Sequence, residues 1–255
     1  MQLPDIATDD RRLVRLDAVH NFRDLGGYPT ADGHTTRWRR LFRADGLHRL
    51  AGEDLETVRE LGLRTVIDLR TDAELEERGT FPVEEHDVDF HHVAIIDRTW
   101  DPAELVDDPD PADFLERAYL KMLEEGERRL AEAYVKLAAP GALPAVFHCA
   151  AGKDRTGLLA MLVLGSLHVP DEYIIADYAL SEEGMQRMIA WAERTYPEMY
   201  ERMKSGPSIF SAARPEAMRR MLAHVREWHG SIEGFLLAMG VPEVAIDRLR
   251  SELLD

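Results

Sequence analysis

Apolar residues along the first third of the chain change their spacing from a helical to a strand period. They recur every third position over residues 55–61, as on one face of a helix, and Gly62 follows as a natural helix end. Residues 64–70 then form a short β-branched run, which predicts a strand. Thr71 with Glu74 three positions later is a capping-box pattern, so we expect a second helix directly after this strand.

The same alternation of strand and helix patterns continues downstream. Residues 87–96 alternate loosely as a second strand, and residues 112–138 are helical with a break at Gly126. Residues 142–148 form a short apolar run, and residues 156–167 are apolar nearly all round, as in a buried central helix. This order predicts an α/β fold, a three-layer sandwich with a mostly parallel central sheet and a ligand site at the carboxyl ends of the strands.

The rest of the chain predicts extra helices and a single domain. Residues 171–255 have a helical pattern with stops at proline- and glycine-bearing positions, of which Pro197 is the first. An acidic, proline-bearing break at 101–111 indicates a loop or linker and does not support a second domain. We expect one domain over 1–255, in which helices within about 181–230 could cover the site as a lid.

The charge balance restricts the partners that the protein can have. There are 31 Lys and Arg against 48 Asp and Glu, so the formal net charge is −17, which repels nucleic acid and anionic lipid surfaces. No segment approaches the roughly 18 uninterrupted apolar residues of a membrane span, and the first residues do not form a secretory signal. We expect a cytoplasmic protein without nucleic acid partners or stable membrane insertion, although release without a signal peptide stays open.

The chain has one cysteine, Cys149, which opens the loop between the predicted strand and the buried helix. A loop that enters a helix start turns backbone N–H groups inward and adds the positive end of the helix dipole, so it can bind an anion. Cysteines at helix N-termini near cations have pKa values of roughly 3.5 to 7.5, against about 8.5 for the free thiol. We therefore expect Cys149 to be a nucleophile. Arg155, six positions later, could hold two phosphate oxygens with its planar guanidinium.

The residues of this loop carry a resemblance to a known family. Cys149, five residues and then Arg155 and Thr156 resemble the signature loop of the cysteine-dependent phosphatases. The longer pattern over 148–157, together with the segments 21–27 and 68–70, is similar to the bacterial tyrosine/serine protein phosphatases. The resemblance implies a protein tyrosine phosphatase, for which dual specificity stays open. It would hydrolyse phosphate monoesters through a phosphocysteine intermediate, without a cofactor or metal.

The resemblance also implies catalytic roles. Cys149 would be the attacking thiolate and Arg155 the phosphate clamp, with backbone amides of 150–155 completing the cradle. Asp154, next to the clamp, would be the general acid that protonates the leaving group. Asp68 would lie close to the loop, either orienting Arg155 or serving as a second acid.

Further positions would contact the substrate. Lys153 resembles the extra cation of this family, which is associated with tolerance of phosphoinositides and of phosphoserine. Thr156 would place a hydroxyl near the thiolate when it leaves in the second step. The substrate-binding positions are then Ala150, Ala151, Gly152, Lys153 and Thr156.

Each of these residues also has a purely structural interpretation. Asp154 could be a salt-bridged staple of the loop, and Asp68 only a structural charge partner of Arg155. The segment 21–27 could be a plain glycine turn. Trp100-Asp101-Pro102 superficially resembles the Trp-Pro-Asp acid loop of eukaryotic tyrosine phosphatases, but its order is scrambled, which favours a turn.

Two other kinds of chemistry are disfavoured by residue spacing. His86, His91 and His92 with Cys149 lack the spacing of a zinc site, so no metal is expected. Gly152-Lys153 lacks both the upstream glycine and the following Ser or Thr of a nucleotide-binding loop.

The expected partners are phosphotyrosine proteins, phosphoserine or phosphothreonine proteins, or phosphoinositides, with phosphate, sulfate or vanadate able to occupy the loop. A phosphoinositide phosphatase is the alternative enzyme, which Lys153 permits and the acidic surface disfavours. An inactive phosphate-binding module is the alternative outside enzymes, although the presence of Cys149, Asp154 and Arg155 argues against it.

Overall fold

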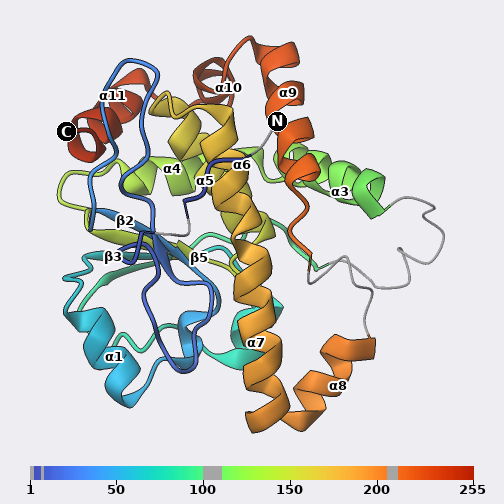
Figure 1. The fold of residues 1–255 in the computed structure, drawn as a ribbon. Coiled ribbons are helices and arrows are strands. Elements are labelled where there is room, and N and C mark those ends of the chain that lie inside the picture. Colours follow the sequence, from blue (N-terminus) through green and yellow to red (C-terminus); the bar gives the residue numbers. More distant parts are fainter. Residues whose placement is uncertain (1–2, 7–8, 100–110, 206–211) are drawn as a thin grey trace.

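A five-stranded sheet lies at the centre of the molecule in the computed structural model, which describes residues 3–6, 9–99, 111–205 and 212–255. The strand order is β1-β2-β5-β3-β4 (Figure 1). The strands are β1 (Arg23–Asp24), β2 (Leu41–Ala44), β3 (Thr65–Asp68), β4 (Asp89–His92) and β5 (Ala145–His148). β1 is antiparallel to β2, and the other neighbouring pairs are parallel, so the predicted mostly parallel sheet is confirmed.

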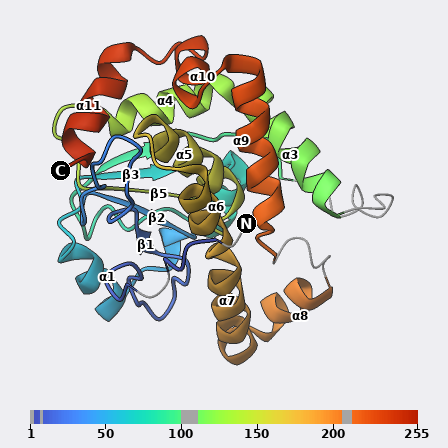
Figure 2. The same ribbon diagram turned by 45° about the horizontal axis from the view of Figure 1, so that its top comes forward.

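Helices cover both faces of this sheet (Figures 1 and 2). One face carries α1 (Gly52–Arg59), and the other carries α5 (Asp154–Ser166) with the helices around it. The remaining elements are η1 (Leu47–Arg49), α2 (Asp72–Arg78), α3 (Pro111–Glu125), α4 (Glu127–Leu137), α6 (Asp171–Ala179), α7 (Ser181–Thr195), α8 (Pro197–Ser205), α9 (Pro215–His229), α10 (Ile232–Ala238) and α11 (Glu243–Leu253). The arrangement is the expected three-layer sandwich.

The alternation of side chains along the strands divides the core into two apolar clusters. Successive side chains of a strand point to opposite faces of the sheet. Val66 of β3 and Val146 of β5 belong to the smaller cluster, which includes Val58 of α1. Their neighbours Ile67 and Phe147 belong to the larger cluster, which includes α5. Both faces of the sheet are thus buried, as the continuous apolar runs of parallel strands require.

α5 is the centre of the larger cluster. Residues 155–164 are all buried, in agreement with the uninterrupted apolar pattern of this segment. The helix begins at Asp154, two residues before the predicted start. Gly165 lets α10 approach closely, because a Cβ at this position would lie 2.7 Å from the side chain of Ile232. This burial fixes the position of the helix start, where the phosphate-binding loop was predicted.

The carboxyl ends of the inner strands lie side by side. His148, the last residue of β5, is in register with Ala44 of β2 and with Asp68 of β3. The loops that follow these three strands therefore meet at one edge of the sheet. This is the edge at which an α/β sheet places its ligand site.

Two strands, β1 and β2, were not predicted from the sequence. All four residues of β2 are buried, and one of them is Arg43, whose side chain is completely enclosed. A charged residue inside a four-residue strand breaks the apolar pattern by which buried strands are identified. β2 is nevertheless an inner strand, between β1 and β5.

The predicted breaks between helices are confirmed at Gly126 and at Pro197. α3 ends and α4 begins on either side of Gly126, and α8 begins with Pro197, a residue that is favoured at the first helical position. α7 extends past the edge of the sheet and α8 lies beside its far end (Figures 1 and 2). Within the described ranges, no helix has both the length and the apolar character that a membrane span needs.

Candidate active site

Cys149 lies at the carboxyl end of the central strand β5 and directly before the loop that leads into α5. The residue is 1% exposed, and its thiol is free. Residues 149–153 form the loop, and α5 starts at Asp154. The first N–H groups of a helix have no partner inside the helix, and its dipole places partial positive charge there. The thiol is therefore next to a group of donors suited to an anion.

Asn21 holds the outer side of this loop. Its side-chain Nδ2 donates to the carbonyl oxygens of Ala151, at 2.9 Å, and of Gly152, at 3.1 Å. In a planar trans peptide the C=O and the following N–H point in opposite directions. The N–H groups of Gly152 and Lys153 are therefore turned to the inner side of the loop. The segment around Asn21 therefore shapes this loop, and is more than a glycine turn.

Two buried arginines and one carboxylate support the same outer side. Arg43 donates from Nη2 to the carbonyl of Gly152 at 2.7 Å. Arg23 donates to the side-chain oxygen of Asn21, and both arginines bind Asp177 of α6. Burial alone would raise the pKa of Asp177, but the two arginines hold it far below its usual range. A permanently charged, enclosed cluster thus fixes Asn21 and the loop carbonyls.

Gly152 is the position at which the loop requires a glycine. Its φ is +65°, and a Cβ there would lie 2.6 Å from the carbonyl oxygen of Ala44. The carbonyl of the preceding loop residue, Ala150, accepts from the backbone N–H of Gly46 at 3.2 Å. The carbonyls of 150–152 therefore all have partners on the outer side.

Arg155 is held by Glu74. The guanidinium donates from Nη1 to Oε2 at 2.5 Å and from Nη2 to Oε1 at 3.0 Å. Glu74 is fixed by the predicted capping box, which is confirmed: its N–H donates to Oγ1 of Thr71, and its carboxylate accepts from the Thr71 N–H. Burial acts to raise the pKa of Glu74, but the hydrogen bonds from Arg155 bring it to about 2. Glu74 uses two of the five N–H groups of Arg155, so up to three remain for a phosphate.

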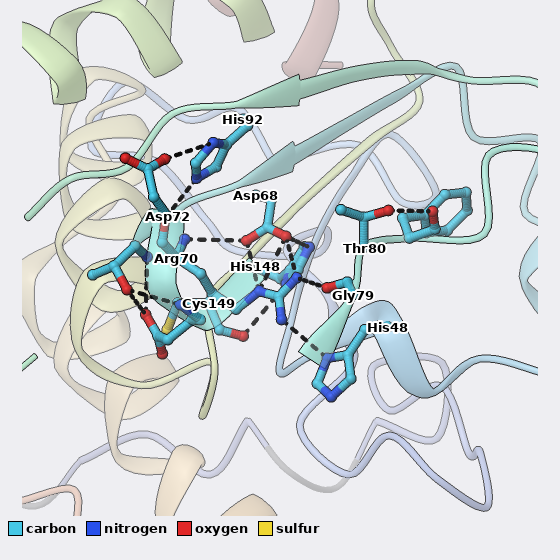
Figure 3. A network of polar contacts seen from close by, with 12 residues as sticks. His48, Asp68, Arg70, Asp72, Gly79, Thr80, His92, His148 and Cys149 are labelled. Atoms are coloured by element: carbon cyan, nitrogen blue, oxygen red, sulfur yellow. Dashed lines mark hydrogen bonds and ion pairs between the residues drawn. The ribbon is translucent and has the colours of Figure 1, made fainter. Parts of the chain in front are cut away.

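Asp68 has a different partner from the one expected, which corrects the expectation that it orients Arg155. Its carboxylate accepts from Arg70 Nε at 2.9 Å and from Arg70 Nη2 at 2.6 Å. Nε2 of His148 lies 3.5 Å from its Oδ2. Figure 3 shows this buried group beside Cys149. Arg70 follows Asp68 by two residues, directly after the end of β3, and binds its carboxylate. Arg155 is bound instead by Glu74, which lies on α2.

Asp154 is the first residue of α5, and its side chain is 18% exposed. The hydroxyl of Tyr119 donates to its Oδ1, and Nζ of Lys153 lies 3.4 Å from the same oxygen. Asp154 is thus adjacent to Arg155 in the chain and reachable from solvent. This placement is compatible with proton transfer, and also with the structural interpretation of an ion-paired loop residue.

The other predicted loop residues differ in where their side chains lie. Ala150 and Ala151 are partly exposed. Lys153 is fully buried, and its Nζ donates to the backbone carbonyl of Ala212 at 3.0 Å. The hydroxyl of Thr156 is buried and has no hydrogen-bond partner among the described residues. A buried hydroxyl without a partner is costly, so Thr156 is suited to a group that arrives with the substrate or on the thiolate.

A groove of about 630 Å³ opens beside Ala150 and Ala151. Its charged lining consists of Arg49, Arg78 and Glu77, in which Arg49 is paired with Asp45 at 2.7 Å and Arg78 with Glu77 at 3.4 Å. The apolar part of the lining comes from α7, α8 and the residue between them, namely Met188, Trp191, Tyr196, Met199 and Met203. An apolar groove with two cations next to an anion cradle suits a phosphorylated ligand that also has apolar and acidic groups.

The remaining candidates are the histidines considered for a zinc site and the segment considered as an acid loop. His91 lies 3.0 Å from Asp89, and Nε2 of His92 lies 2.8 Å from the carbonyl of Arg70. The Trp100-Asp101-Pro102 segment lies outside the described residues. Its assignment as a turn therefore stays a prediction.

A comparison with known protein families matches residues 14–255 to the tyrosine phosphatase family. The chain belongs to this family. The matched range contains the segments around Asn21 and Asp68 and the Cys149 loop, so the resemblance carried by these motifs is confirmed. The match also extends beyond these segments, to residue 255.

Two relatives of this tyrosine phosphatase share most of its length. The triple specificity protein phosphatase PtpB of Mycobacterium tuberculosis is 28% identical, over 94% of this chain and 98% of PtpB. A tyrosine-protein phosphatase of Nostoc commune is 26% identical, over 83% of this chain and 73% of its own length. Among solved structures, TpbA of Pseudomonas aeruginosa in complex with phosphotyrosine matches at a TM-score of 0.34 and 13% identity. That match covers 78% of this chain and 99% of TpbA.

Sequence reasoning missed several residues that build the site of this phosphatase. Glu74 was identified only as a helix cap, and its pairing with Arg155 depends on the packing of α2 against the loop. Arg43 and Asp177 are 134 positions apart, and a single chain carries no signal that joins them. Tyr119 lies inside an amphipathic helix pattern, where an aromatic residue is ordinarily part of the core.

Proposed function

We propose that this member of the tyrosine phosphatase family hydrolyses phosphate monoesters through a covalent phosphocysteine intermediate. The Sγ of Cys149, as thiolate, attacks the phosphorus, an S–P bond forms and the bond to the leaving oxygen breaks. The inward N–H groups of the loop and the guanidinium of Arg155 hold the phosphate oxygens as charge builds on them. The observation that carries the proposal is the loop itself, whose carbonyls are fixed outward by Asn21 and Arg43 next to a buried thiol.

Asp154 supplies and recovers the proton. It protonates the leaving oxygen in the first step, and in the second step it accepts a proton from the water that attacks the phosphorus. The S–P bond then breaks and the thiolate returns. We assign its stabilisation to the buried hydroxyl of Thr156, which has no hydrogen-bond partner among the described residues. The support for this role is the position of Asp154 next to Arg155, with partial exposure to solvent.

Asp68 is proposed to position the site and not to transfer protons. Both of its carboxylate oxygens accept from Arg70, and the side chain is completely buried. A carboxylate that is enclosed and doubly bound to an arginine favours its charged form and is poorly placed to deliver a proton to a leaving group. Its Oδ2 lies 3.5 Å from Nε2 of His148, the residue directly before Cys149.

The proposed substrates are phosphotyrosine proteins, with phosphoserine and phosphothreonine proteins as an extension. The groove supports this class, because Trp191 and the methionines can bind an aryl group and nearby apolar residues, while Arg49 and Arg78 can bind acidic ones. Phosphoinositides are the second candidate. The relative PtpB has a name that states triple specificity, and Arg49 and Arg78 of the groove could bind further phosphates if these replace their carboxylate partners Asp45 and Glu77.

Turnover assays separate these proposals. We expect p-nitrophenyl phosphate to be hydrolysed, orthovanadate to inhibit, and EDTA to leave the rate unchanged. The values of kcat/KM on phosphotyrosine, phosphoserine and phosphoinositide substrates then rank the three classes. Binding of phosphate without any turnover would support an inactive binding module and contradict the enzyme. A rate lost on chelation and restored by a divalent cation would contradict the mechanism without metal.

A further inference from the structure

Three elements meet at the side chain of Asp154. Oδ1 of Asp154, at the start of α5, accepts a hydrogen bond from the hydroxyl of Tyr119 in α3. The hydroxyl of Tyr119 lies 2.7 Å from the hydroxyl of Tyr178 in α6. Both tyrosines are at most 1% exposed, so solvent water does not compete for the hydrogen bonds of their hydroxyls. The mechanism proposed above uses Asp154 but neither tyrosine.

The hydrogen bonds that link Tyr178, Tyr119 and Asp154 can run in only one direction when Asp154 is ionised. A carboxylate only accepts, so Tyr119 must donate its single proton to Asp154. The oxygen of Tyr119 is then available as an acceptor, and Tyr178 donates to it. Burial, followed by the charge of Asp154, raises the pKa of Tyr119 well above its usual value, so its proton stays in place. Linked hydrogen bonds of this kind polarise and strengthen one another.

We propose that Tyr119, supported by Tyr178, is a positioning residue that fixes the carboxyl group of Asp154 and leaves Oδ2 to carry the proton to the leaving group. The inference rests on the proposed role of Asp154 as general acid. The contact with Lys153 Nζ, at 3.4 Å, is also made by Oδ1. Among the described residues, these two contacts of the carboxyl group are thus both at Oδ1, which leaves Oδ2 for proton transfer.

The packing around the tyrosines holds this geometry. The two rings meet edge to face, with centroids 6.2 Å apart and an angle of 84°. Gly157, in the first turn of α5, allows the ring of Tyr178 to approach, since a Cβ there would lie 3.1 Å from its Cδ2. The glycine that ends the signature loop thus has a physical role, which is to admit the residue that supports Tyr119.

The hydroxyl of Tyr119 acts as a donor, so its hydrogen bond is made to the ionised form of a carboxylate. A donor that binds the ionised carboxylate favours that form over the protonated acid. In the part of the chain that the structure describes, the charged groups beside this cluster include Lys153 and Arg155 next to Asp154, and Arg43 and Glu182 near Tyr178. None of these is changed when the hydroxyl of Tyr119 alone is removed.

The test is Tyr119→Phe, which deletes one hydroxyl and keeps the ring. We expect the alkaline limb of kcat/KM for phosphotyrosine to move to higher pH by roughly one unit. A shift of this size corresponds to the free energy of one hydrogen bond to a charged group. We expect kcat/KM for phosphotyrosine to fall roughly tenfold, and that for p-nitrophenyl phosphate to fall less, because its phenol needs little protonation. Tyr178→Phe should move the limb in the same direction by a smaller amount, and it keeps the inference testable if Tyr119→Phe folds poorly.

Tyr134→Phe is the matched control. Its hydroxyl is also buried and contacts Ser166 Oγ at 2.7 Å, away from the loop, so its loss should leave the pH profile unchanged. An unmoved limb in Tyr119→Phe, or a move to lower pH, would overturn the inference. Asp154→Asn separates the two proposals. If it shows no loss selective for the poorer leaving group, the assignment of the acid fails. If Asp154→Asn shows this selective loss and Tyr119→Phe keeps the wild-type pH profile, only the inference about Tyr119 fails.

Discussion

The pairing of Arg155 with Glu74 makes Glu74→Gln an informative substitution. Glutamine has nearly the same shape as glutamate, and it is accepted at the third helical position of a capping box, so α2 should keep its start. Its side chain retains one acceptor oxygen for Arg155, but its NH2 group faces the second guanidinium nitrogen. One of the two hydrogen bonds, at 2.5 Å and 3.0 Å, is therefore lost together with the negative charge.

The size of the effect follows from the value of that hydrogen bond. A hydrogen bond to a charged group contributes about 1.5–3 kcal/mol. If this free energy holds the clamp in its reactive orientation, its loss lowers kcat/KM about 10- to 150-fold, at about 1.4 kcal/mol per tenfold change. The affinity for orthovanadate should fall as well, because the same guanidinium binds the ground-state oxyanion.

The assay is kcat/KM on p-nitrophenyl phosphate, with the free energy of unfolding measured in urea for each variant. Glu76→Gln is the control, because it makes the same change of charge on an exposed position of α2. We expect the control to behave as the wild type. If Glu74→Gln stays within twofold of the wild type while Asp68→Asn loses tenfold or more, the clamp is oriented through Asp68 and our interpretation of the geometry is refuted.

The same pair predicts a pH dependence of stability. The pKa of Glu74 is lowered from 4.5 to about 2, so the folded state favours its ionised form. The stability gained is fully present above about pH 4.5 and is lost as the pH falls toward 2, with a total of about 3 kcal/mol. The free energy of unfolding should therefore decrease less between about pH 5 and pH 3 in Glu74→Gln than in the wild type. Equal decreases in both proteins would contradict an ionised, buried partner of Arg155.

Four further substitutions test other parts of the site. Gly152→Ala should lower kcat/KM by about 100-fold or more, because a positive φ and the contact with Ala44 both oppose a Cβ; a wild-type rate would contradict the cradle geometry. Asn21→Ala removes two hydrogen bonds that hold the loop carbonyls, so orthovanadate inhibition should weaken about tenfold or more, and unchanged inhibition would contradict this role. Asp154→Asn should slow phosphotyrosine turnover about 100-fold and p-nitrophenyl phosphate less, whereas Asp68→Asn should slow both equally; a selective loss in Asp68→Asn would move the acid there.

The loop and its surroundings could be predicted in part because their signals are local. The apolar run over 142–148 and the apolar helix after it are contiguous in the chain, and both elements formed where the pattern indicated. Cys149 opens the loop between them and Arg155 lies in the first turn of the helix, so their proximity follows from chain connectivity. The capping box of Thr71 and Glu74 is equally local, and it was predicted with its hydrogen bonds.

The features that were not predicted depend on contacts between distant segments. Arg43 is a charged residue in a buried strand, and it becomes acceptable only because Asp177 reaches it from α6. The role of Asn21 is visible only when the carbonyls of the loop are in place. The expectation that helices within 181–230 act as a lid stays a prediction, although residues of α7 and α8 line the groove beside the loop.

The measurement that tests the central claim most directly is the detection of a phosphoryl group on Cys149 during turnover. The wild-type protein and Cys149→Ser are mixed with p-nitrophenyl phosphate, quenched in acid within the first turnovers, digested, and analysed by mass spectrometry. We predict that the wild-type peptide containing Cys149 gains the mass of one phosphoryl group. We also predict that Cys149→Ser has no turnover yet still binds orthovanadate, because a hydroxyl is scarcely ionised near neutral pH. Turnover by Cys149→Ser within tenfold of the wild-type rate, or a phosphoryl group found on another residue instead, would contradict the account.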